Sequence, residues 1–277
     1  MGFLDGTFYA TPPFFDQIFT IHGLKFDCAF PCIFAVLPDR KKATYQELFQ
    51  EVKSIAASMG QIWQPDQIMS DFETGLMPAV SAEFPLCVHK GCFYHYSQCL
   101  YRRIQSTGLA TAYSQDEALR SCCKKLMALP FLPINEVENA FYSLRTTADQ
   151  EVKKKLRDLF LYFDDYWLNT VPVEMWNIHG CDHRTNNICE GFHSRLNRRI
   201  ESAHGNMWSF IRCIISEEAR FQHLYVQTIT GARRRPVPRS TNSIQGRIDT
   251  LMARYNDKNI DVEQLLDNLS LLIGKKK

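Results

Sequence analysis

Three acidic residues that lie far apart in the sequence could together form a metal site. Asp5 lies in the first predicted strand, Asp71 directly follows the fourth, and Glu190 lies in the first turns of a predicted helix. If those two strands are neighbours, both aspartates can face one point, and a helix packed alongside can add the glutamate. Converging carboxylates repel one another unless a cation neutralises them, and such hard oxygen ligands suit Mg²⁺ or Mn²⁺. Two such ions can clamp the attacking and leaving oxygens of a phosphodiester.

The helix that carries Glu190 is predicted to begin near residue 185 and to continue to about Thr228. Three polar residues can cap its first turn: Thr185, Asn186 and Asn187. His193 and Asn197 follow Glu190 by three and seven residues, so all three share one face. Three arginines flank that face and could contact DNA phosphates: Arg195, Arg198 and Arg199. The alternative is an ordinary solvated helix surface.

Upstream of that helix, strand and helix patterns alternate. The predicted strands cover residues 3–9, 17–22, 29–37, 67–70 and 86–89. A helix from Thr44, with a capping box to Glu47, runs to Gly60, and a second helix covers about 74–84. Short connections favour an antiparallel meander for the first three strands, and the helices then act as crossovers. The sequence therefore predicts an α/β fold with a mixed sheet.

An all-helical region interrupts this pattern between about residues 107 and 175. We expect it to be an insertion into the sheet domain, which would span residues 1–228. A basic, proline-containing linker and two short helices complete the chain over residues 229–277. Arg233–Arg235 and Arg239 in this linker could contact phosphates, act as a nuclear import signal, or simply be solvated.

The composition is that of an ordinary globular protein of 277 residues with a net charge of +2, so global charge does not point to nucleic acid. We expect no secretory signal, because the N-terminus carries an acid and no long apolar run. No apolar stretch approaches membrane-spanning length. The ten cysteines are therefore expected to be reduced or metal-bound.

Five sequence pieces, in order, resemble the transposase domain of Mutator-like elements, the MULE family. The resemblance spans roughly residues 1 to 225, and the pieces are Asp5-Gly6-Thr7-Phe8, Phe34-Ala35-Val36-Leu37-Pro38, Ser70-Asp71-Phe72-Glu73, Cys92-Phe93-Tyr94-His95, and Thr185-Asn186-Asn187 with Glu190, Phe192, His193 and Asn197. Each piece alone is weak, whereas the ordered set is specific.

This resemblance implies a ribonuclease H-like fold with a D-D-E triad, in which Asp5, Asp71 and Glu190 bind Mg²⁺ or Mn²⁺. It implies cleavage of DNA at element ends by water, followed by attack of a freed 3′-hydroxyl on target DNA. It also places Cys92 and His95 near the catalytic centre and the helical insertion before the glutamate. Nuclear localisation and homo-oligomers follow from the same resemblance, although the sequence contains no dimerisation motif.

Members of that family usually carry a zinc-binding DNA-recognition domain before the catalytic core, and this sequence contains none. A fragment, a degenerate copy and a host-adopted derivative all fit that departure. The second hypothesis is therefore a transposase-derived, non-catalytic module that binds DNA or protein. Two local alternatives also stay open. Cys92 and His95 could be half of a zinc site completed by Cys181 and His183, and Glu73 is expected to be a solvated loop acid.

Overall fold

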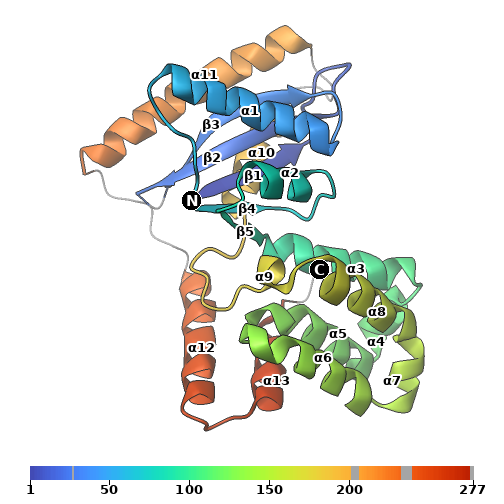
Figure 1. Ribbon diagram of the computed structural model, residues 1–277. Coiled ribbons are helices and arrows are strands. Elements are labelled where there is room, and N and C mark those ends of the chain that lie inside the picture. The colour runs from blue at the N-terminus through green and yellow to red at the C-terminus, as the bar shows by residue number, and fades with distance from the viewer. Residues whose placement is uncertain (27, 201–205, 232–238, 275–277) are drawn as a thin grey trace. The chain divides into compact units, whose positions relative to one another are not determined.

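The computed structural model describes residues 1–26, 28–200, 206–231 and 239–274. The chain divides into two compact units (Figure 1). The first combines Met1–Cys92 with Thr185–Arg234, and the second combines Phe93–Arg184 with Arg235–Lys277. None of the described helices is both long and apolar enough to span a membrane.

The first unit contains a five-stranded mixed sheet with the strand order β3-β2-β1-β4-β5. Its strands are β1 (Gly2–Thr7), β2 (Gln17–Lys25), β3 (Cys28–Leu37), β4 (Gln67–Ser70) and β5 (Val88–Gly91). The β1–β2 and β2–β3 pairs are antiparallel, and the β1–β4 and β4–β5 pairs are parallel. The predicted mixed α/β sheet is confirmed, and its first and fourth strands are neighbours, which is the condition that the proposed metal site requires.

Helices cover both faces of this sheet (Figure 1). On one face, α1 (Lys42–Ser58) and α2 (Leu76–Glu83) share an apolar core with the strands that includes Leu4, Phe19 and Ile21. On the other face, α10 (Asn187–Arg199) and α11 (Met207–Ile229) pack against Ile18. This division follows from the strand period, because successive side chains point to opposite faces of the sheet.

Two local predictions about the helices of this unit are wrong. The Thr44–Glu47 capping box does not form, because α1 has Lys41 at its N-cap and the Thr44 hydroxyl instead donates to Asp39 Oδ1 at 2.6 Å. The helix that carries Glu190 does not run unbroken to Thr228, because α10 ends at Arg199 and α11 begins at Met207. Residues 201–205 between them lie outside the described residues.

Asn186 is the N-cap of α10, at one of the three predicted positions, but its side chain accepts no capping hydrogen bond. The next helix, α11, is capped as its sequence suggests, since the Asn206 side chain accepts from the Ser209 N–H at 2.9 Å. The N-terminal end of α10 is therefore held by its packing against the sheet rather than by a local cap.

The second unit is helical throughout its described residues, which agrees with the helical pattern of the sequence. Its elements are α3 (Phe93–Ser106), α4 (Ala110–Gln115), α5 (Glu117–Ala128), η1 (Leu129–Phe131), α6 (Ile134–Thr147), α7 (Gln150–Lys155), α8 (Arg157–Tyr162), the π-helix η2 (Phe163–Thr170), α9 (Val173–Trp176), α12 (Arg239–Asn256) and α13 (Val262–Leu272). Tyr96, Trp167 and Trp176 are buried together, and the Trp176 indole N–H donates to Trp167 O at 2.8 Å.

The predicted boundary at residue 228 stays a prediction, as does the wider domain assignment. Arg233–Arg235 lie outside the described residues.

Candidate active site

The register of the central strands brings Asp5 and Asp71 side by side. Phe3 of β1 pairs with Met69 of the parallel strand β4, and Asp5 and Asp71 each follow two residues later. Because side chains alternate along a strand, Asp5 points to the same face as Phe3. Phe3 and Met69 share a small core with Cys189 of α10. Asp5 therefore faces the helix that carries Glu190.

Asp5 is held by contacts to both of its carboxylate oxygens. The Gly6 N–H donates to Oδ1 at 3.0 Å, and His193 Nδ1 lies 3.4 Å from Oδ2. The residue is only 5% exposed. A carboxylate fixed at both oxygens inside a protein cannot turn freely, so its direction is set before any ligand arrives.

The pKa of Asp71 reflects both its burial and the nearby charge of Asp5. Burial, and then the negative charge of Asp5, raises the pKa of Asp71 to about 6. Its Oδ1 atom is buried and has no hydrogen-bond partner among the residues that the structure describes. A buried, unpaired acceptor is costly, and a cation would satisfy it.

Glu190 directly follows Cys189 on α10, and α10 packs on β1. Burial, followed by the charges of Asp5, Cys92 and Glu190, raises the pKa of the Cys189 thiol, so these four groups share one neighbourhood. Within the described part of the chain, however, no three His, Cys, Asp or Glu side chains are grouped closely enough to hold a metal ion. The convergence of Glu190 with the two aspartates stays a prediction.

Cys92 and His95 lie in different units. Cys92 is buried at the end of β5, and its N–H donates to Ser70 O at 2.8 Å, beside the end of the strand that precedes Asp71. His95 belongs to α3 of the second unit. Neither the supporting role of this pair nor its zinc alternative is tested by this placement, and both stay predictions.

Two side chains of α10 contact the sheet beside Asp5. His193 Nε2 lies 3.0 Å from the Thr20 hydroxyl of β2. Asn197, one turn further on, lies within hydrogen-bond distance of the Thr7 hydroxyl, with its Nδ2 at 3.4 Å. The predicted shared face of His193 and Asn197 is therefore the face that α10 presents to the sheet.

The arginines of α10 are engaged by a carboxylate that the sequence analysis missed. Glu217 of α11 is fully buried, and its oxygens lie 2.8 Å from Arg195 Nη2 and 2.7 Å from Arg199 Nη1. Arg195 also stacks on Phe192 and Phe221. Its charge is thus used inside the protein. Glu217 sits in an acidic Glu-Glu pair on a long helix, and such a pair gives no sequence signal of burial.

Arg198 and Arg199 remain more accessible than Arg195. Arg198 is exposed and its Nε donates to Ser194 O at 3.1 Å within the same helix. The Arg199 side chain is 43% exposed although it contacts Glu217. The predicted contact of these arginines with DNA stays a prediction.

Glu73 is a second group whose environment the sequence did not reveal. Instead of a solvated loop acid, it is a half-buried one whose Oε1 accepts from the Tyr45 hydroxyl at 2.6 Å. Tyr45 in turn accepts from Gln17 Nε2 at 2.5 Å. Burial and the charge of Asp71 raise the pKa of Glu73 to about 7, against the lowering effect of Tyr45. The acidic cluster around Asp71 is therefore larger than two residues.

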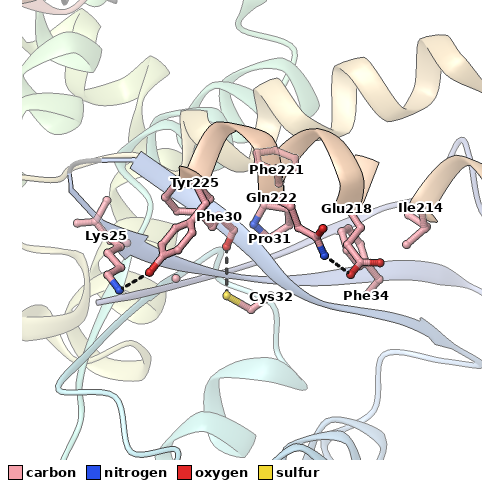
Figure 2. Close-up of a pocket in the computed structure, with 12 residues that line it drawn as sticks. Lys25, Phe30, Pro31, Cys32, Phe34, Ile214, Glu218, Phe221, Gln222 and Tyr225 are labelled. Carbon is pink, nitrogen blue, oxygen red and sulfur yellow. Dashed lines mark hydrogen bonds between the residues drawn. The ribbon is translucent and has the colours of Figure 1, made fainter. Parts of the chain in front are cut away.

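A groove between the β2–β3 hairpin and α11 is a separate feature of the same unit (Figure 2). Aromatic side chains line it, and the Lys25 ammonium donates to the Tyr225 hydroxyl at 2.9 Å across it. Its described lining contains none of the predicted site residues. The groove and the acidic cluster are therefore different sites.

Residues 1–99 match the family model described as the MULE transposase domain. This match confirms the resemblance for the part of the chain that includes Asp5, Asp71 and Cys92 and ends before Glu190. No curated protein matches the chain.

The raised pKa of Asp71 predicts how stability depends on pH. The folded value of about 6 lies above the ordinary 3.8, so the native state binds more protons in this window, and the free energy of unfolding falls as pH rises through it. Asp71→Asn removes the ionisable carboxyl and therefore this fall in the free energy of unfolding. In chelator, it should raise the free energy of unfolding at pH 7 by about 3 kcal/mol at most, and the gain should vanish near pH 4.

Urea denaturation at several pH values measures this effect. Glu73→Gln is the control. The pKa of Glu73 is raised from 4.5 to about 7, so the pH range over which this substitution changes stability should lie higher than that of Asp71→Asn. An Asp71→Asn chain that is less stable than wild type at pH 7, with an unchanged pH slope, would contradict the raised pKa of Asp71.

The buried Glu217 predicts a second stability effect. Glu217→Gln leaves Arg195 and Arg199 without their carboxylate and should lower the free energy of unfolding by about 3 kcal/mol. Glu218→Gln, at the next and exposed position, is the matched control and should change it by less than about 0.5 kcal/mol. Equal effects of the two substitutions in urea denaturation would show that Glu217 does not hold α10 to α11.

Proposed function

We propose, on the premise of the MULE transposase match over residues 1–99, that this chain is the catalytic domain of a Mutator-like DNA transposase. It cleaves DNA phosphodiesters with a divalent metal and joins the freed 3′-hydroxyl to target DNA. The observation that carries the proposal is that Asp5 of β1 and Asp71, directly after the neighbouring parallel strand β4, lie near each other inside the matched region.

The residues present fit a hard divalent cation. All three predicted ligands offer carboxylate oxygens, and Asp71 Oδ1 is a buried acceptor with no partner in the described residues. The repulsion between Asp5 and Asp71 is the state that a cation relieves. Asp5, Asp71 and Glu190 would hold Mg²⁺ or Mn²⁺. Once bound, such ions stabilise the charge on the attacking and leaving oxygens of the phosphodiester.

The fold supports the same proposal. The strand order β3-β2-β1-β4-β5, with β1 and β4 parallel, one acid in β1 and another directly after β4, is the arrangement expected of a ribonuclease H-like domain. The second unit interrupts the first between Cys92 and Thr185, so a helical segment precedes the helix of Glu190 as proposed for the insertion. Within this account the partners are DNA at element ends and at the target, the location is the nucleus, and the active form is a homo-oligomer.

The protein's own side chains would orient the DNA and the acids. His193 and Asn197 fix α10 on the strands next to Asp5, which sets the position of Glu190 one turn before His193. Arg198 and Arg199 lie on the outward side of the same helix and can meet a phosphate backbone that approaches Glu190.

A second candidate function is a non-catalytic DNA-binding module derived from such a transposase. One observation favours it: the described residues contain no ready group of three metal ligands. Under this reading the chain binds DNA with a strong dependence on salt and never cleaves it. The two functions differ in a single measurable product, the nicked strand.

Cleavage of supercoiled plasmid DNA in Mn²⁺ tests the leading proposal. Asp71→Asn keeps the shape of the side chain but removes its charge, and it should reduce nicking by at least about 100-fold because a metal ligand is lost. Asp39→Asn is the control, since Asp39 is a surface acid paired with Lys41. Nicking by wild type that Asp71→Asn leaves unchanged would remove the triad from the account.

The salt dependence of DNA affinity tests the arginines. If Arg198 contacts a phosphate, Arg198→Ala should reduce the slope of log affinity against log salt by about 0.9, because one fewer counterion is released. Lys53→Ala is the control, since Lys53 lies on α1, on the other face of the sheet, and pairs with Glu83. Fluorescence anisotropy with a short duplex gives both slopes, and an equal change in the two variants would exclude a specific role for α10.

A further inference from the structure

A continuous chain of buried polar groups connects Asp5 to the interior of the first unit. His193 Nδ1 lies 3.4 Å from Asp5 Oδ2, and His193 Nε2 lies 3.0 Å from the Thr20 hydroxyl. His22 Nε2 lies 3.1 Å from the same hydroxyl. The sheet register produces this chain, because Thr20 is directly opposite Asp5 and His22 is opposite Phe3, so both point to the α10 face.

The burial of these groups fixes which of them donate. His22 Nδ1 is buried without a hydrogen-bond partner in the described residues. An N–H without an acceptor would be costly at that position, so we place the ring proton on Nε2 and leave Nδ1 unprotonated. Burial also lowers the pKa of His22 to about 3, which keeps the ring neutral. The Nε2–H of His22 therefore donates to the Thr20 hydroxyl oxygen.

The remaining links follow from the acid at the other end. A carboxylate accepts hydrogen bonds, so the nitrogen of His193 that faces Asp5 must carry a proton. A neutral His193 then has a bare Nε2, which needs a donor, and the Thr20 hydroxyl is the donor within reach. The hydroxyl proton has a second acceptor, Asp5 O, at 3.2 Å, but Nε2 is nearer.

We propose that His193 is a positioning residue for Asp5, and that the Thr20 hydroxyl and His22 hold its imidazole in the tautomer with the proton on Nδ1. The hydrogen bonds run in one direction, from His22 through Thr20 to His193, whose Nδ1 lies 3.4 Å from the Asp5 carboxylate. Together with the Gly6 N–H, they fix the direction of Asp5 before a cation or DNA is bound.

The polar chain contains a hydroxyl, an imidazole and a carboxylate in the same order as a catalytic triad, but the Thr20 hydroxyl cannot act as a nucleophile. Thr20 is fully buried in the described structure, so its hydroxyl cannot reach a substrate. A partner that fixes the tautomer and orientation of a histidine beside a ligand typically changes metal affinity by 10–100-fold when it is removed. The role of the chain is therefore to orient Asp5, and its effect on metal binding rests on the proposed function.

Nitrogen-15 NMR of the histidine rings, in metal-free protein with chelator at pH 7.5, tests the tautomers directly. Wild type should show His22 with its proton on Nε2 and His193 with its proton on Nδ1. Thr20→Val, which removes only the hydroxyl, should shift the His193 signals toward a mixture of tautomers, whereas Thr20→Ser should restore them. Thr11→Val removes another buried hydroxyl and should leave His193 unchanged.

Two results would overturn the proposal: a wild-type His193 with its proton on Nε2 or on both nitrogens, or a folded Thr20→Val with an unchanged His193. If Thr20→Val does not fold, the wild-type tautomers and Thr20→Ser still decide. Mn²⁺ affinity by electron paramagnetic resonance gives the second readout, with a loss of about tenfold expected in Thr20→Val. The predicted tautomers in a wild-type chain that binds no Mn²⁺ would support the positioning of Asp5 and reject the proposed metal site.

Discussion

A buried carboxylate, Asp5, and a partly buried one near it, Asp71, are the constraint on which the rest of the first unit depends. Asp5 lies in β1 and Asp71 directly follows the parallel strand β4, and the negative charge of Asp5 adds to burial in making Asp71 harder to ionise. Burying like charges destabilises a fold, so the surrounding structure must hold them there at a cost. The sheet does so by pairing β1 with β2 along its whole length and with β4 at Gly2 and Phe3, which fixes the backbone positions of the two strands.

Because side chains alternate along β1, one face of this strand packs the apolar core and the other carries the acid. Leu4 points into the apolar core under α1 and α2, whereas Phe3 and Asp5 point toward α10. One face of the sheet is therefore mainly apolar around Leu4, and the other mixes apolar packing with a polar strip. Helix α10 must satisfy both, and it does so with Phe192 and Leu196 for packing and His193 and Asn197 for the polar strip.

The features that could be predicted from the sequence are those with a period or a close partner in the chain. The strand Gln67–Ser70 was predicted at its observed bounds. The neighbouring position of the first and fourth strands was a condition of the metal-site hypothesis and was not itself predicted. Asp71 could be placed at a strand end, because the apolar run before it is short and continuous.

The features that could not be predicted depend on partners distant in the sequence. Glu217 is buried because Arg195 and Arg199 surround it, and Glu73 is half-buried because Tyr45 reaches it from α1. The predicted cap at Thr44 does not form, because the Thr44 hydroxyl donates a hydrogen bond to Asp39 in the preceding turn. The break after Arg199 had no Pro to mark it, and the apolar spacing continued across it. For the two glutamates a tertiary contact outweighed the local pattern, whereas the Thr44 hydroxyl found a partner only five residues away.

The central claim is that the paired acids hold a divalent cation, and isothermal titration calorimetry of Mn²⁺ and Mg²⁺ into the wild-type chain and Asp5→Ala tests it most directly. The account predicts saturable binding to wild type that is lost in a folded Asp5→Ala chain. Binding of equal strength to both chains, or none to the wild-type chain even with a DNA duplex present, would contradict it.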